Sequence, residues 1–132
     1  MKRITLLFLT IASAALFSTS CTEEEVHPSF DQSLIIGTWE SGTWQSSTWQ
    51  SDSIFERYDR GNTGATWDVK DDVTEAEAQK FTWTIEKDVL EQIHIIENGG
   101  VSPRVYTITV LTASTLEYKD EKSGTTTSFI KQ

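Results

Sequence analysis

Carboxylates crowd one stretch of the sequence, and oxygen-rich loops of this kind can hold Ca²⁺. The stretch contains Asp68, Asp71, Asp72, Glu75 and Glu77. Their spacing does not match an EF-hand, and the stretch has no glycine where a calcium loop turns sharply. We therefore expect a solvated acidic loop and no metal site.

Few residues could act as a nucleophile or a general base. The two histidines are His27, near the N-terminus, and His94, in an isoleucine-rich stretch. Glu91 and His94 are three residues apart, so they would face opposite sides of a strand. No serine lies in a strand-to-helix elbow of the kind that exposes a nucleophile. The abundance of carboxylates leaves a glycosidase-like pair open, but we expect no catalytic residue, no cofactor and no enzyme.

A five-residue pattern, x-Thr-Trp-x-Ser, occurs three times and contains Trp39, Trp44 and Trp49. Five is odd, so in one regular strand Trp44 would face away from the other two tryptophans, unless a bulge near Gly42 returns it to the inner face. An exposed Trp44 is typical of binding surfaces for sugars, peptides or partner proteins. The alternative is that Trp44 covers an apolar gap or stacks on a neighbour.

The length, charge and cysteine count of the chain limit the number of domains and the kinds of binding site it can have. The chain has 132 residues, enough for one domain, and its 14 aromatic residues can form a core. The net charge of −9 argues against binding nucleic acid through a basic patch. A single cysteine excludes an intramolecular disulfide framework and a cysteine-rich zinc site.

The N-terminus has the pattern of a secretory signal. Lys2 and Arg3 precede an uncharged run over residues 4–17 that is too short to span a bilayer. Residues 1–20 followed by Cys21 resemble a bacterial lipoprotein signal peptide, which implies that Cys21 is lipidated and becomes the mature N-terminus. Ordinary secretion with a free Cys21 is the alternative.

Residues 21–33 are expected to form an acidic flexible tether, because three adjacent glutamates at 23–25 repel one another. The acidic cluster resembles the surface-export signal of Bacteroidota lipoproteins. That resemblance implies an outer-membrane lipoprotein exposed on the cell surface; the alternative is a charged spacer facing the periplasm. Removing the cations Lys2 and Arg3 with the signal takes the net charge from −9 to −11.

The rest of the chain, residues 34–132, alternates apolar and polar residues as half-buried strands do. The pattern predicts eight strands, at residues 38–49, 53–59, 64–70, 80–86, 89–97, 104–111, 115–120 and 124–131. The helical signal over residues 74–79 is a capping box from Thr74 to Glu77. Short turns between successive strands favour an all-β, eight-stranded antiparallel up-and-down barrel; a two-sheet sandwich is the alternative.

Gly37-Thr38-Trp39 at the head of the first strand resembles the opening motif of lipocalins. The order of the later motifs, from Phe81-Thr82-Trp83 onwards, is similar to that in small lipocalin-like domains of Bacteroidota lipoproteins. The resemblance covers residues 34–132. It implies that Trp39 packs across the closed end of the barrel. Lipocalins usually pair this tryptophan with an arginine near the end of the last strand, and Lys131 stands there in this chain.

The alternation also predicts which side chains point into the barrel. They are Trp39, Phe55, Trp67, Phe81, Trp83, Ile93, Ile95, Tyr106, Ile108, Val110, Leu116, Tyr118 and Phe129. These residues could line an apolar pocket with tyrosine hydroxyls as polar anchors, or they could fill a narrow barrel completely.

Two functions follow from these alternatives. The first is a lipid-anchored barrel that binds a small apolar or glycan ligand or a partner protein of the envelope. The candidate ligand-binding residues are Trp44, Trp67, Trp83, Tyr106 and Tyr118. The second is a structural or assembly accessory lipoprotein with a filled core and no small-molecule ligand. Both attach to the outer membrane through the N-terminal lipid, and neither binds nucleic acid.

Overall fold

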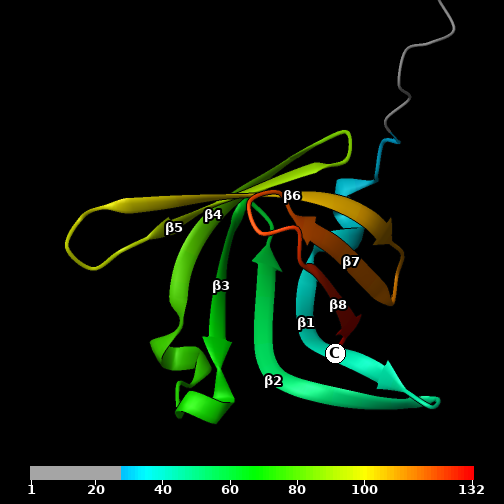
Figure 1. The fold of residues 1–132 in the computed structure, drawn as a ribbon. Coiled ribbons are helices and arrows are strands. Elements are labelled where there is room, and N and C mark those ends of the chain that lie inside the picture. The colour runs from blue at the N-terminus through cyan, green and yellow to red at the C-terminus, as the bar shows by residue number, and fades with distance from the viewer. Residues whose placement is uncertain (1–27) are drawn as a thin grey trace, which may run out of the picture.

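The alternating segments pair in sequence order and close on themselves. The computed structural model describes residues 28–132, and each strand pairs antiparallel with the next, while β1 also pairs with β8 (Figure 1). The strands are β1 (Gly37–Gln45), β2 (Thr48–Asp59), β3 (Thr63–Asp68), β4 (Gln79–Glu86), β5 (Val89–Ile95), β6 (Val101–Leu111), β7 (Thr115–Asp120) and β8 (Thr126–Lys131). The predicted eight-stranded up-and-down barrel is therefore confirmed.

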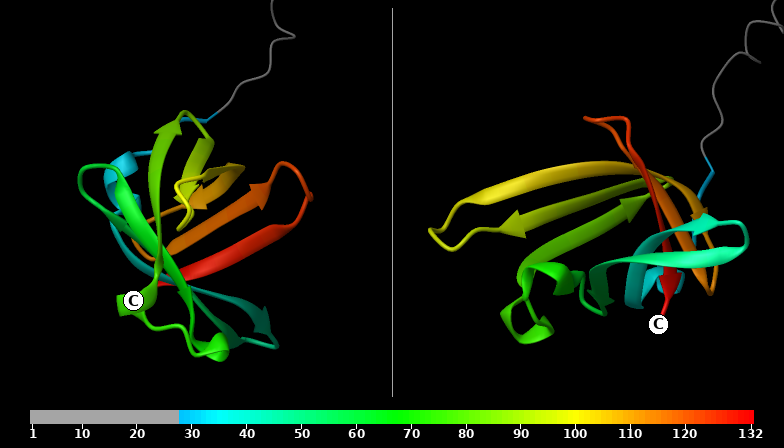
Figure 2. Two further views of the ribbon diagram at one scale, coloured as in Figure 1. Left: turned by 90° about the vertical axis from the view of Figure 1, so that its left-hand side faces the viewer. Right: turned by 60° about the horizontal axis from the view of Figure 1, so that its bottom comes forward.

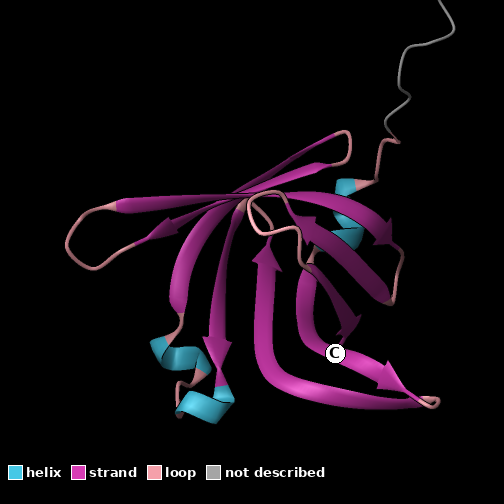
Figure 3. Ribbon diagram, in the orientation of Figure 1, coloured by secondary structure: helices cyan, strands magenta, loops and turns pink. Residues whose placement is uncertain are grey.

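Three short 3₁₀ helices complete the described chain: η1 (Gln32–Ile35), η2 (Val69–Asp71) and η3 (Glu75–Glu77). Figure 3 shows η1 at one end of the barrel and the pair η2 and η3 at the other. The predicted capping box from Thr74 to Glu77 begins η3. No helix within residues 28–132 is long and apolar enough to cross a membrane.

Contacts with the barrel begin at Phe30, inside the range 21–33 that we expected to be a tether. Phe30 packs against the core cluster, and Gln32 donates a hydrogen bond to the Ile85 carbonyl at 3.0 Å. The expected signal peptide and Cys21 lie outside the described residues. The folded part of the chain thus starts slightly earlier than the strand pattern indicated.

The first turn differs from the prediction of one strand over residues 38–49. The chain reverses at Ser46 and Ser47, whose φ angles are 51° and 72°. Two residues with positive φ form the tight hairpin turns that match the twist of paired strands. Across this turn Trp44 pairs with Trp49, whereas Trp39 lies further back in β1 and pairs with Glu56. The stretch predicted as one strand is therefore a hairpin, and its turn falls between the second and third copies of the five-residue repeat.

The β1–β2 hairpin is irregular on the β2 side. Ser41 alone lies between the partners Glu40 and Gly42, whereas three residues, 52–54, lie opposite it in β2. Ser53 there has φ of 63°. The irregularity bends β2, and the tip of the hairpin extends away from the barrel (Figures 1 and 2). Alternation along β1 is not interrupted, so Trp39 points inward and Trp44 outward.

Five residues expected inside the barrel point outward: Phe55, Trp67, Ile93, Ile95 and Val110. Phe55 and Trp67 are cross-strand partners whose rings stack at 5.5 Å on the outer face. A bulge in β6 after Ile108 turns Val110 outward and Leu111 inward. In β5 the inward residues include Gln92 and His94. Both are buried, and hydrogen bonds to other interior groups offset the cost of removing their polar atoms from water.

The apolar core fills one half of the barrel. Its buried members are Ile35, Trp39, Tyr58, Phe81, Trp83, Ile85, Leu90, Tyr106, Ile108, Leu111, Leu116, Tyr118 and Phe129. The cluster lies toward the end closed by η1, where Ile35 and the partly buried Leu34 and Ile36 cover Trp39. The opposite half of the interior is lined mostly by polar residues, together with the core members Tyr106, Tyr118 and Phe129.

Candidate functional site

The open half of the barrel contains a hollow of about 450 Å³, here called the lumen cavity. It is lined by residues from every strand except β4, and from the β7–β8 turn: Ser41, Asp52, Ile54, Glu56, Thr66, His94, Arg104, Tyr106, Tyr118, Asp120, Ser123, Thr125, Thr127 and Phe129. Ligand sites in proteins commonly have volumes in this range. The interior is thus filled at the closed end and hollow at the open end.

A buried carboxylate forms the floor of the lumen cavity. Glu56 alternates with Tyr58 along β2, so both side chains point inward, and Glu56 is only 7% exposed. The Tyr58 hydroxyl donates to Glu56 Oε1 at 2.6 Å, and the Tyr118 hydroxyl donates to Oε2 at 2.7 Å. Tyr118 comes from β7 on the far side of the barrel, so this carboxylate connects distant parts of the chain.

The hydrogen bonds continue from Glu56 along β5. Gln92 donates through Nε2 to the Tyr58 hydroxyl at 2.7 Å and accepts at Oε1 from His94 Nε2 at 2.7 Å. The other ring nitrogen of His94 lies 2.7 Å from Gln79 Oε1 in β4. Four strands therefore share one interior network, which explains why polar residues occupy the inner face of β5.

Burial changes the acid–base properties of this network. It raises the pKa of Glu56 above its ordinary value, although the hydrogen bonds from Tyr58, Tyr118 and Gln92 oppose the shift. Burial and the neighbouring Glu56 charge raise the pKa values of Tyr58 and Tyr118 well above 10.0. Both hydroxyls therefore stay protonated and keep donating to the carboxylate.

His94 is neutral at physiological pH. Burial, followed by the positive charge of Arg104, lowers the His94 pKa from 6.5 to about 4. A neutral imidazole adds no positive charge to the lumen cavity. With Nε2 donating to Gln92, the neutral ring keeps Nδ1 as an acceptor that faces the side-chain amide of Gln79.

One hydroxyl at the floor has no hydrogen-bond partner among the residues that the structure describes. Ser41 is 2% exposed, its side chain lines the lumen cavity, and within the described chain its Oγ makes no hydrogen bond. Buried hydroxyls are nearly always hydrogen-bonded, because leaving one unpaired costs about 1–3 kcal/mol. Ser41 Oγ is thus an available donor and acceptor inside the hollow.

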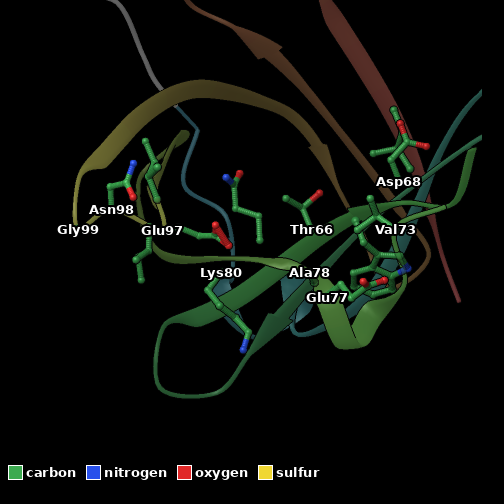
Figure 4. A pocket seen from close by; sticks show the side chains of 14 residues that line it. Thr66, Asp68, Val73, Glu77, Ala78, Lys80, Glu97, Asn98 and Gly99 are labelled. Carbon is green, nitrogen blue, oxygen red and sulfur yellow. The ribbon is translucent and has the colours of Figure 1, made fainter. Parts of the chain in front are cut away.

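Next to the lumen cavity lies a larger depression with a volume of about 910 Å³, here called the mouth groove. Figure 4 shows Glu97, Asn98 and Gly99 of the β5–β6 turn on one side and Val73, Glu77 and Ala78 on the other. β3 and β4 stop pairing at Thr66 and Gln79, which leaves this side of the barrel open. Ile54 and Thr66 line both spaces, so the mouth groove leads into the lumen cavity.

Comparison with known proteins assigns this barrel to a protein family. The sequence profile of the lipocalin-like domain family matches residues 35–118. The chain belongs to the lipocalin-like domain family. The match contains the whole floor of the lumen cavity, from Ser41 to Tyr118.

Solved structures share the fold of this lipocalin-like domain at low sequence identity. A lipocalin-like protein from Bacteroides uniformis ATCC 8492 has a TM-score of 0.53 and 16% identity over 75% of this chain and 99% of that chain. An uncharacterized protein from Bacteroides eggerthii DSM 20697 has a TM-score of 0.53 and 15% identity over 74% of this chain and 99% of that chain. No curated protein sequence matches the chain.

The closed end of the lipocalin-like domain has the arrangement that the resemblance implied. Trp39 is fully buried, and its Nε1 donates to the Ile35 carbonyl at 2.8 Å. Lys131 Nζ lies 5.0 Å from the centre of the Trp39 ring and donates to the Leu34 carbonyl at 3.1 Å. A lysine therefore makes the cation contact for which lipocalins usually use arginine.

The expected ligand-binding residues separate into three groups. Tyr106 and Tyr118 stack at 4.1 Å and line the lumen cavity. Trp67 lines the mouth groove from the outer face, and Trp83 is part of the core, where its Nε1 donates to the Thr63 carbonyl at 2.9 Å. Trp44 lies in the β1–β2 hairpin and lines neither space.

Sequence reasoning missed Ser41, Glu56, Gln92, His94 and Arg104. A signal for Glu56 was available, because it is in phase with Tyr58 along β2. Likewise, Gln92 and His94 are in phase with Leu90. A consistent period of two would have placed all three inside the barrel.

Replacing Trp44 with alanine is expected to destabilise the domain by only about 1 kcal/mol, the size of one aromatic pair contact. Trp44 is 61% exposed and meets the Trp49 ring edge-on at 5.3 Å, while Trp49 Nε1 donates to Glu40 Oε1 at 3.1 Å. Urea denaturation measures the change. A loss as large as that of a core tryptophan would contradict this placement.

Proposed function

We propose that this lipocalin-like domain binds a small amphipathic molecule in the open half of its barrel and does not catalyse a reaction. The observation that carries the proposal is the lumen cavity, whose floor holds the Ser41 hydroxyl, a group with no hydrogen bond within residues 28–132. A ligand's polar group would meet this floor. Its apolar part would lie in the mouth groove against side chains such as Ile54, Val73 and Ile96.

Filling the lumen cavity tests the proposal. Thr127 lines the cavity from β8, whereas its neighbour Thr126 is exposed on the outer face. We expect Thr127→Trp to weaken binding of the neutral dye N-phenyl-1-naphthylamine by about tenfold or more, and Thr126→Trp to leave it unchanged within twofold. Dye fluorescence measures the affinity. Equal binding by the two variants, or no binding by the unaltered protein, would contradict the proposal.

We also propose that the protein is a lipoprotein anchored at Cys21 to the outer membrane and exposed on the cell surface. The support is the signal pattern over residues 1–20 and the acidic segment that follows. Mass spectrometry of the mature protein should show acyl chains on Cys21. Protease treatment of intact cells should remove the domain; protection would argue for the periplasmic side.

A further inference from the structure

Glu56 is a buried carboxyl group that makes no ion-pair contact within residues 28–132, and Arg104 acts on it only through its charge at a distance. Within residues 28–132 no lysine or arginine forms an ion pair with it, and the hydrogen-bond donors around it are the uncharged Tyr58, Tyr118 and Gln92. Buried carboxylates in proteins are normally paired with a cation or coordinate a metal, because desolvating a charge is costly. The floor of the lumen cavity is therefore poised to accept a positive charge from a ligand.

The other charged groups that line the lumen cavity also favour a positively charged ligand. Asp52 and Asp120 add two carboxylates to Glu56, and Arg104 is the cation of the lining. Arg104 is exposed at the rim, and His94 is neutral at pH 7. Negative charge therefore exceeds positive charge in the space that a ligand would enter.

Free acceptors at the floor match a primary ammonium group. This group has three N–H donors and no acceptor. Among residues 28–132, Ser41 Oγ has no hydrogen-bond partner and Glu56 Oε2 accepts from Tyr118 alone. The stacked rings of Tyr106 and Tyr118 line the same space and can attract a cation.

The mouth groove suits the other end of such a molecule. Ile95 and Ile96 line it and are 49% and 40% exposed, and Ile54 continues the apolar surface down into the lumen cavity. Apolar side chains left this exposed favour contact with a hydrocarbon chain.

We infer that the barrel selects amphipathic amines, with the ammonium group at Glu56 and Ser41 and the hydrocarbon part in the mouth groove. This inference rests on the proposed function, since it names the class of ligand for the same cavity. It also assigns Glu56 the role of counter-charge.

Three probes with the same twelve-carbon chain test the inference: dodecylamine, 1-dodecanol and dodecanoic acid, each below its aggregation concentration at pH 7. Their affinities are measured by displacement of N-phenyl-1-naphthylamine. We expect the amine to bind about tenfold or more tightly than the acid, with the alcohol between them. Failure of all three to bind would overturn the proposed function itself. Binding of the alcohol without preference for the amine over the acid would overturn only the inference.

Variants locate the preference at the floor. Glu56→Gln keeps the shape of the side chain and is expected to reduce the amine-to-acid ratio about tenfold while leaving 1-dodecanol binding unchanged. Glu91→Gln removes the same charge from the outer face of β5 and should leave the ratio unchanged. Arg104→Gln at the rim, which leaves the Glu56 network intact, should increase the ratio. An unchanged ratio in both Glu56→Gln and Arg104→Gln, or equal effects of Glu56→Gln and Glu91→Gln, would overturn the assignment.

Discussion

Replacement of Trp39 by alanine is expected to lower the free energy of unfolding by about 4 kcal/mol, the usual cost of removing a buried tryptophan side chain. Trp39 is fully buried and belongs to the core cluster, so alanine would leave a large void at the closed end. The substitution also removes the partner of the Ile35 carbonyl and the ring beneath Lys131. Urea denaturation followed by circular dichroism measures the loss.

Two further variants divide this cost into its parts. Trp39→Phe keeps most of the apolar volume but loses the Nε1 hydrogen bond, so its cost should be about 1–2 kcal/mol. Lys131→Met keeps most of the side chain that lies against Gly37 but removes the charge over the ring. Its expected cost is about 1 kcal/mol. A Trp39→Ala loss no larger than that of Trp44→Ala would show that Trp39 does not hold the closed end together.

Acidification is the second change with a large expected effect, and it acts through His94. The His94 pKa is about 4 in the folded protein and 6.5 as the ordinary value, so the unfolded chain binds a proton more readily. The contribution of His94 to the free energy of unfolding is therefore complete above about pH 6.5 and falls as the pH drops toward 4. The full loss from this residue is up to about 3 kcal/mol.

Glu56 contributes with the opposite sign. Its folded pKa is raised above 4.5, so the folded state takes up this proton before the unfolded state does, and stability rises as the pH falls through the raised pKa. The His94 contribution is isolated by comparing the unaltered protein with His94→Gln. Denaturation free energies measured between pH 7 and pH 4 should decline less steeply in the variant. Identical slopes would mean that His94 does not carry the effect.

Several features of the fold could be predicted because their causes are local. The alternation in residues such as Phe81, Trp83 and Ile85 is a property of consecutive side chains and identifies β4 directly. The capping box from Thr74 to Glu77 also lies within four residues. Short connections between neighbouring strands then favour the meander that the structure contains.

The first hairpin shows where local reasoning was insufficient. Ser46 and Ser47 lack the Asn-Gly signature that usually marks a turn with positive φ. The pairing of Trp44 with Trp49 across this turn stabilises a conformation that the two serines do not themselves favour. Partner strands, rather than turn residues, decided where the chain reverses.

By itself, the amino-acid sequence determined the number of strands and their antiparallel order, because alternation and short turns carry that information, while the role of Trp39 came from the resemblance of the opening motif. The tertiary structure alone decided the candidate site. Glu56 and Tyr118 are 62 residues apart, and their hydrogen bond exists only once the barrel has closed. That closure makes it favourable to bury Gln92 and His94 while Ile93 and Ile95 face outward. Hydrophobic pattern favours the opposite face for β5, and the interior hydrogen bonds outweigh it.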